Sequence, residues 1–446
     1  MAEASKTWGV SEVSKASWQD SLPPTQNDTV IFDYWNNCKH NSRPHTTFDI
    51  QLYCPDSTKV QNIIIRNFSD FDKKINVHGI LRSMKPNQEL DIRGNLIREM
   101  NLYEGGFEFG VSSWNHKNGL MQLSIKIGGD IVVGKSDINS SCGGALFLGA
   151  NGDAFQDAFG GPKKVLVEGN VNLYGAGELH PNVGDDSSSN EADNDQNCFK
   201  VNGIVTLNPI DAFYPIWITN CRNRKVSEST KPLNAVVKIG GLEGNGVVKN
   251  NTKDLGGSST IVFTNPQNRV CVFSGRIQDD AVIGGKSTVN IVMDGDGAQY
   301  LRKSMGDYRF TGGITVERGM LFLNSSQPIG DVLLKGGMIG TTAWDIESAG
   351  NLVVNNFECA GGTIMAILED AGNASLIEVR GNFSATAPVK FNFVLKSYVL
   401  LGKYKIIAWE KKPNIENTQF SSNNLGEIKP VFEVASDGLY VTFVKR

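Results

Sequence analysis

The sequence predicts an all-β fold of the parallel β-helix type, a solenoid in which the chain keeps coiling in one direction. Short segments of alternating apolar and polar residues are followed by Gly-Asn or Gly-Gly pairs. These segments return roughly every 34 to 41 residues in the first half, enough for one generous coil or two tight ones. We find no segment with a convincing helical period of 3.6 residues, so strands and glycine corners account for the regular structure.

The segment at residues 308–330 shows this organisation best, because strands and glycine corners alternate along it. Gly312–Gly313 and Gly319 mark the corners. The apolar strand positions are Ile314, Val316, Met320, Phe322 and Leu323. Such short strands could fold back as hairpins or continue as a coil, and the recurrence of similar segments favours the coil.

The same pattern is compact at residues 90–95, LDIRGN, where alternation stops on Gly-Asn. Alternation turns one face of each strand inward and the other outward. We expect the glycine to adopt a positive φ, which a sharp corner needs. Further copies lie at residues 123–130, 165–170, 199–203, 236–241 and 377–382.

Four regions follow from this pattern. We expect an N-terminal cap with the first strands at residues 1–59 and a β-helix body at 60–300. Further coils then span 301–395, and a β-rich C-terminal cap spans 396–446. Caps are expected because the ends of a solenoid otherwise expose unpaired strand edges.

Residues 184–197, GDDSSSNEADNDQN, form an acidic insertion within the predicted body. We expect a solvated loop there, because the stretch has almost no apolar side chain. Its acids could bind calcium, although they lack the glycine and distal glutamate of an EF-hand loop. We therefore predict no resident metal or cofactor, with calcium as the alternative.

Charge and hydrophobicity limit the partners and the cellular locations that we expect for this protein. The net charge is −4 and the pI is near 5.8, which makes nucleic acid an unexpected partner. No run of 18 apolar residues occurs, so we expect no membrane-spanning helix. The first residues, MAEASKTW, lack an apolar leader, so the protein is either cytosolic or an exported chain whose signal peptide has been removed.

The seven cysteines are scattered, and none forms a CxxC pair. Cys38 and Cys54 are the nearest in sequence and could bridge in an oxidising compartment. The alternative is a set of buried free thiols that behave as small apolar residues. We expect a monomer, in which an odd count leaves at least one thiol unpaired.

Residues 308–324, YRFTGGITVERGMLFLN, resemble the autotransporter-associated β-strand repeat, which reads approximately Y-x-x-x-G-x-T-x-V-x-x-G-T-L-x-L-N. Met320 stands where the repeat usually has threonine. The opening W…PPTQNDTVIFD and the closing YKII…LYVTF are similar to the ends of the same large bacterial surface proteins. The matching positions are Tyr308, Gly312 or Gly313, Thr315, Val316, Gly319, Leu321, Leu323 and Asn324.

This resemblance covers under a tenth of the chain in its strong part. It implies a right-handed parallel β-helix that is secreted or displayed at a Gram-negative cell surface. It implies no catalytic residues, because the repeat is a structural unit. Proteins of this kind are adhesins or scaffolds, and less often proteases or polysaccharide-degrading enzymes.

Asp294 and Asp296 are the candidate catalytic residues. Their i, i+2 spacing would project both carboxylates from one face of a strand. Two such carboxylates could divide the acid and base roles of a hydrolase, or hold a hard cation. The competing interpretation of Asp-Gly-Asp-Gly is a tight turn.

The candidate binding residues are aromatic or imidazole side chains in two loop-like clusters: Trp114, His116, Tyr214 and Trp217. Exposed aromatics on a solenoid could bind a glycan or a protein. Their alternative role is packing against the coil.

Together these features favour an exported structural or adhesin-like protein that binds host or matrix glycoprotein or glycan. The alternative is a secreted hydrolase that acts on mucin-type glycoprotein through acidic residues. We favour binding over catalysis, because no metal, nucleophile or phosphate-binding motif occurs in the sequence.

Overall fold

The computed structural model is all-β. The structure describes residues 5–9, 17–18, 25–33, 45–52, 58–66, 76–83, 89–99, 105–111, 124–134, 143–148, 164–180, 198–220, 234–251, 257–279, 287–302, 310–342, 348–369, 372–396, 402–423 and 425–445. Within these ranges helical backbone is confined to the 3₁₀ turn η5 at Asn417–Gln419 and a single 3₁₀ position at Gly372.

The chain divides into two compact units, and each is described by itself. Unit 1 comprises residues 1–239, 244–259 and 280–287, and unit 2 comprises residues 240–243, 260–279 and 288–446. Three strands contain residues of both units: β21 (Leu242–Gly244), β23 (Gly257–Phe263) and β26 (Ser287–Leu301).

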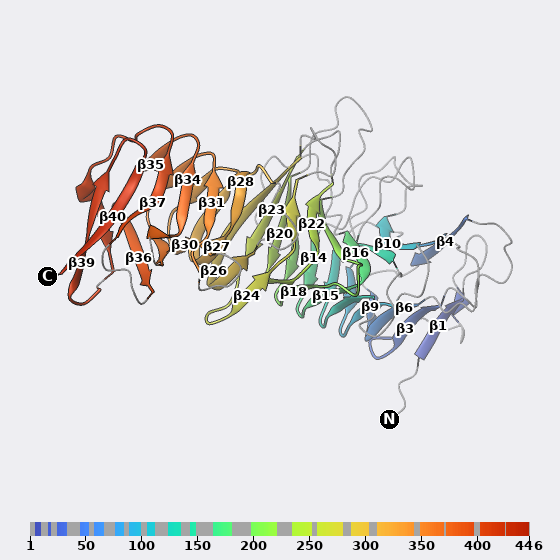
Figure 1. Cartoon of the computed structure of the whole chain (residues 1–446). Coiled ribbons are helices and arrows are strands. Elements are labelled where there is room, and N and C mark those ends of the chain that lie inside the picture. The colour runs from blue at the N-terminus through green and yellow to red at the C-terminus, as the bar shows by residue number, and fades with distance from the viewer. Residues whose placement is uncertain are drawn as a thin grey trace. The chain divides into compact units, whose positions relative to one another are not determined.

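Unit 1 is a stack of coils whose strands form three parallel rows (Figure 1). The first row holds β5 (Thr58–Val60), β8 (Glu89–Ile92), β11 (Ser124–Ile127), β14 (Lys164–Val167), β17 (Cys198–Val201) and β20 (Ala235–Ile239). The second row holds β1 (Ser5–Gly9), β3 (Thr29–Asp33), β6 (Asn62–Arg66), β9 (Leu96–Arg98), β12 (Ile131–Val133), β15 (Val171–Tyr174) and β18 (Val205–Asn208).

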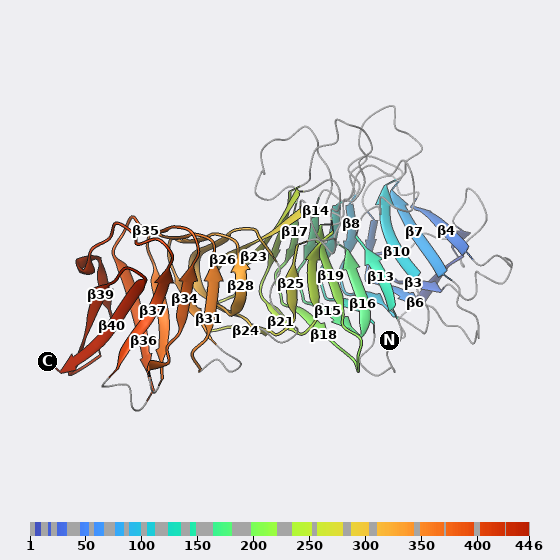
Figure 2. The same ribbon diagram turned by 45° about the horizontal axis from the view of Figure 1, so that its top comes forward.

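The strands of the third row of unit 1 lie side by side in Figure 2. It holds β4 (His45–Leu52), β7 (Asn76–Ser83), β10 (Gly105–Val111), β13 (Gly143–Phe147), β16 (Ala176–His180), β19 (Ile216–Asn220) and β22 (Val247–Asn250). Its strands pair in parallel with their neighbours, for example β7 with β10. The predicted parallel solenoid is therefore confirmed.

Unit 2 repeats the arrangement with shorter coils. Two long strands, β26 and β27 (Ile314–Leu323), bend at a corner, so that β27 pairs with two later strands. The further strands of the two rows that meet at this corner are β24 (Val270–Phe273), β29 (Val332–Leu334), β30 (Met338–Thr341), β32 (Phe357–Cys359), β33 (Thr363–Leu368), β35 (Phe383–Ala385), β36 (Val389–Leu395) and β38 (Phe420–Ser422). The third row holds β28 (Ser325–Ile329), β31 (Asn351–Val354), β34 (Leu376–Val379), β37 (Lys403–Trp409), β40 (Gly438–Lys445) and β39 (Ile428–Val434), while β25 (Arg276–Gln278) also lies in this unit.

The terminal strands leave the parallel pattern. β40 runs antiparallel to both β37 and β39, which ends the coil as a β-rich cap. At the other end β1 pairs antiparallel with β2 (Ser17–Trp18), and the backbones of Trp8 and Trp18 are partners. The handedness of the coil, expected from the resemblance, stays a prediction.

The core is built by stacking inward side chains of successive coils in register. Leu90, Ile125 and Val165 are partners on neighbouring strands and are 2%, 1% and 0% exposed. Each fully buried aliphatic side chain stabilises the fold by roughly 1.5–3 kcal/mol. The alternation seen in the sequence therefore corresponds to a continuous apolar column.

Candidate functional site

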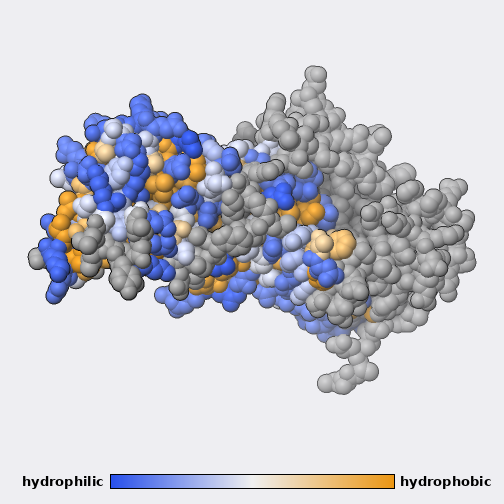
Figure 3. All heavy atoms as spheres, in the orientation of Figure 1, coloured by the Kyte–Doolittle hydropathy of each residue, from blue (hydrophilic) through white to orange (hydrophobic). Residues whose placement is uncertain are grey.

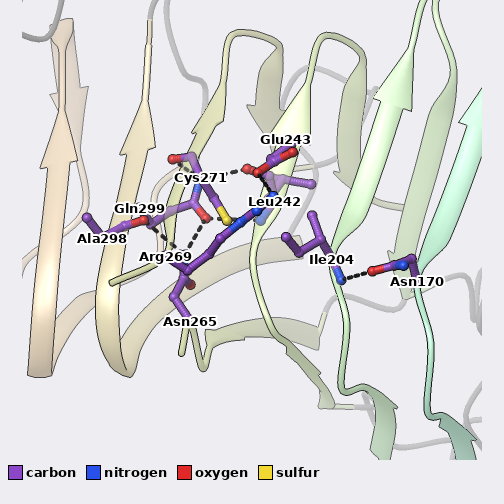
Figure 4. A network of polar contacts seen from close by, with 9 residues as sticks. All are labelled: Asn170, Ile204, Leu242, Glu243, Asn265, Arg269, Cys271, Ala298 and Gln299. Carbon is purple, nitrogen blue, oxygen red and sulfur yellow. Dashed lines mark hydrogen bonds and ion pairs between the residues drawn. The ribbon is translucent and has the colours of Figure 1, made fainter. Parts of the chain in front are cut away.

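The corners of unit 1 are joined by a ladder of side-chain amides and carboxylates. Asn62 Oδ1 accepts a hydrogen bond from the Asn95 amide at 2.8 Å, and Asn95 Oδ1 accepts from the Asp130 amide at 2.8 Å. Asp130 Oδ1 and Asn170 Oδ1 continue the series at 2.7 Å and 2.9 Å, the last bond ending on the Ile204 amide (Figure 4). Each rung satisfies a corner N–H that lies between two strands.

The glycines before these corners have a different role from the one predicted. Gly94, Gly129 and Gly169 do not adopt a positive φ, so the expectation for them is wrong. An added Cβ on Gly94 would instead collide with Asn62 Oδ1, and one on Gly169 would collide with Asp130 Oδ1. The Gly-Asn pair therefore serves two coils, because the glycine makes room for the preceding ladder side chain while the following asparagine extends the ladder.

Asp294 and Asp296 lie at the bend of β26, where its register with β27 shifts. The Asp296 amide donates to Asn265 O at 2.8 Å, and an added Cβ on Gly295 would collide with the Asn265 backbone. Gly295 and Gly297, whose added Cβ would collide with Pro266 O, thus allow the bend to stack closely on the preceding coil. The strand runs through Asp294 and Asp296 without a turn, so the tight-turn interpretation is wrong and the expected i, i+2 placement on one face of a strand is confirmed.

One guanidinium holds both acids. Arg318 Nε lies 2.8 Å from Asp294 Oδ1, and Arg318 Nη1 lies 3.1 Å from Asp296 Oδ1. The hydrogen bond to Asp294, with the charges of both acids, raises the pKa of Arg318. All three side chains are exposed, so the arrangement is a solvated ion-pair triad. A catalytic role for Asp294 and Asp296 stays a prediction.

Neighbouring turns of unit 2 carry similar pairs. Arg269 Nη2 lies 2.6 Å from Glu243 Oε1, and Lys335 Nζ lies 2.8 Å from Glu317 Oε1. Together with the triad, these pairs bring four carboxylates and three cationic side chains to this side of unit 2, which we call the charged edge. Opposite charges on adjacent strands attract, so this edge is neutralised locally.

Beneath the charged edge, an uncharged network that the sequence analysis missed joins three coils (Figure 4). Gln299 is fully buried, accepts from the Leu242 amide at 3.0 Å and donates to Leu242 O at 2.9 Å. The carboxamide of Gln299 thereby pairs with the N–H and C=O of Leu242 as the backbone of a neighbouring strand would. Asn265, also fully buried, donates to Ala298 O at 3.0 Å. A glutamine at an inward position of an alternating strand was the available sequence indication.

Cys271 adjoins this network as a buried free thiol. Burial raises its pKa to about 11, against the smaller opposing effect of a hydrogen bond with Arg269. An added Cβ on Gly241 would collide with Cys271 Sγ. The thiol therefore fills space as a protonated group, as the alternative of buried free cysteines predicted.

Of the four candidate binding residues, the structure describes Tyr214 and Trp217, and neither is an exposed side chain. Trp217 is 0% exposed and its ring lies 6.5 Å from that of Phe199, so it packs in the core of unit 1. Tyr214 is half-buried in the segment before β19. Trp114 and His116 lie outside the described residues, as do Cys38, Cys54 and the acidic insertion at residues 184–197.

A hydrogen-bonded pair of a histidine and a glutamate on β16 was not predicted from the sequence. His180 Nε2 lies 2.9 Å from Glu178 Oε2 on β16. Burial is the largest single influence on Glu178 and acts to raise its pKa, but the hydrogen bond and charge of His180, with the charge of Lys249, lower it overall. Across the described ranges, no group of three or more His, Cys, Asp or Glu residues could hold a metal ion.

Fold and site together define an all-β parallel solenoid, in which one set of polar side chains bonds the corners of successive coils. Comparison with protein-family models, with curated proteins and with solved structures finds no match. The described part of the chain contains no helix long and apolar enough to cross a membrane.

Proposed function

We propose that this chain is an exported or cell-surface solenoid that binds host or matrix glycoprotein through its outer faces, and that it acts as a monomer. The observation that supports this is the register of the coils. Strand partners such as Lys200 and Lys238 place outward side chains one strand spacing apart, which is about 4.8 Å. A rigid, ridged face of this kind suits an extended polymer better than a small molecule.

The surface composition agrees with an aqueous partner. In Figure 3 hydrophilic side chains cover most of the visible described surface, with small apolar patches between them. The large apolar side chains exposed among the described residues are few: Phe213, Val270, Val394, Val431 and Val444. Polar and charged contacts would therefore contribute most of the binding.

Retention of labelled mucin on immobilised protein tests the proposal, with matrix protein tested in parallel. A blank result with both would overturn the binding function. The competing hydrolase, acting through Asp294 and Asp296, should instead release fragments from mucin at mildly acidic pH and lose that activity in Asp296→Asn. Retention of intact mucin across the pH range would exclude this hydrolase.

A further inference from the structure

One outward row of unit 1 carries lysine at four of its six positions. The register makes these six residues successive partners on neighbouring strands: Lys59, Asp91, Lys126, Leu166, Lys200 and Lys238. Leu90 and Ile92, on either side of Asp91, are buried in the core. Alternation therefore turns the row outward. We call these six residues the lysine row.

The row is positively charged within a chain whose net charge is −4. Four lysines and one aspartate give it a net charge of +3. Two of its ion pairs are long, with both lysine side chains exposed: Lys59 Nζ lies 3.9 Å from the partly buried Asp91 Oδ2, and Lys126 Nζ lies 4.0 Å from Glu168 Oε1. Pairs of this kind contribute little, so these ammonium groups remain able to exchange partners.

The spacing of the charges suits a linear polyanion. Lys59, Lys126 and Lys200 stand on alternate coils, which places their backbones about 10 Å apart. That distance is comparable to one disaccharide of an extended sugar chain. Single-stranded nucleic acid would also require aromatic platforms for its bases, and the six positions of the row hold none.

We propose that the lysine row binds a linear acidic polysaccharide, bearing sulfate or carboxylate groups, laid along the stacking direction of the coils of unit 1. The inference rests on the proposed function, because it names the class of glycan that the glycoprotein partner would carry. Several weak ion pairs along one chain add to a useful avidity. Since each depends on exposed charges, binding should weaken steeply as salt rises.

Affinity for heparin, a sulfated polysaccharide used here as the probe, tests the assignment. The double variant Lys126→Glu/Lys200→Glu should bind at least 10-fold more weakly than the native chain. Lys390→Glu/Lys429→Glu makes the same charge change at two exposed positions of unit 2 and should bind within about 2-fold of it. Asp91→Asn should tighten binding, because it removes the one negative charge of the row. Circular dichroism and melting curves verify that all variants fold.

Equal weakening in both double variants would overturn the assignment, because it would show a response to net charge alone. So would unchanged binding in Lys126→Glu/Lys200→Glu, or tighter binding of single-stranded DNA that displaces the probe. Desulfated heparin, which keeps its carboxylates, should bind more weakly because it carries fewer negative charges. If the protein retains mucin but does not bind heparin, this inference fails while the proposed function stands. If it binds heparin through the row but retains no mucin, the row is supported and the glycoprotein partner is not.

Discussion

The two units use glycine differently at the corner where the chain passes from the first row of strands to the second. In unit 1, Gly94 and Gly169 keep φ outside the left-handed region and are required because a ladder side chain occupies the space of a Cβ. In unit 2, Gly319 and Gly337 stand at φ +67° and +59°. Glycine at a corner therefore answers two separate needs, close approach and backbone conformation, and a sequence alone shows only that glycine is present.

Unit 2 also has a ladder, but at another corner, the one that leads from the third row into the first. Asp331 Oδ1 accepts from the Asn356 amide at 3.2 Å, and Asn356 Oδ1 accepts from the Asn382 amide at 2.8 Å. Gly381 precedes Asn382 and makes room for Asn356 Oδ1. The Gly-Asn device is thus transferable between corners.

The largest effect is expected for Gly319→Val. This position combines φ +67° with a collision between an added Cβ and Gly295 O. We expect a loss of about 3 kcal/mol or more in the free energy of unfolding. Gly426→Val is the matched control, since Gly426 has φ +70° with nothing near an added Cβ. It should lose about 1–2 kcal/mol. Equal losses of unfolding free energy in the two variants, measured by denaturant titration, would show that backbone conformation alone matters. An unchanged melting temperature for Gly319→Val would contradict the placement of Gly319 at a tight corner.

Stability at high pH tests the packing around Gly241. The pKa of Cys271 is about 11 in the folded protein, above the ordinary value of 9.0. Because the folded state holds the proton more tightly, this contribution is complete below pH 9 and is lost as the pH rises toward 11. The native chain should lose about 2 kcal/mol more than Cys271→Ala over that interval. Identical slopes for the two proteins, followed by chemical denaturation, would contradict the buried thiol.

A double-mutant cycle isolates the close-approach role of glycine. Asn356→Ala should cost about 1 kcal/mol, because the Asn382 amide loses its acceptor. Gly381→Ala should cost about 1–3 kcal/mol through the collision with Asn356 Oδ1. Combined, they should cost less than the sum by roughly 0.5–1 kcal/mol, since removing the carboxamide removes the nearest atom that an added Cβ on Gly381 would meet. Additive losses would mean that the glycine is needed for another reason.

Asp296→Asn should have the smallest effect. Its bond to Arg318 is exposed, and Arg318 keeps its shorter contact with Asp294. The melting temperature should stay within experimental error of the native value, and its salt dependence should change little. A clear fall in the melting temperature would show that the triad contributes to the stability of the bend in β26.

The sequence predicted the architecture because its pattern is local. Alternation before Gly94-Asn95 identifies a strand that ends at a corner without any knowledge of the fold. The reason for the glycine was not predictable in the same way, because the atom that excludes a Cβ belongs to Asn62, one coil earlier. The same holds for Gln299, whose backbone partner Leu242 lies 57 residues away. Trp217 shows the converse, since an aromatic beside a turn suggested an exposed site and proved to be core.

The ladder of unit 1 has a further consequence for how such a chain can change. Its bonds connect residues 33, 35, 40 and 34 positions apart, yet their lengths stay between 2.7 and 2.9 Å. Corner geometry is therefore insensitive to the number of residues in a coil. Insertions and deletions between corners can be accepted without disturbing the alignment of the strands, because longer connections cost little extra entropy. A connecting segment could therefore be replaced by one of another length while the same ladder of corner bonds is kept.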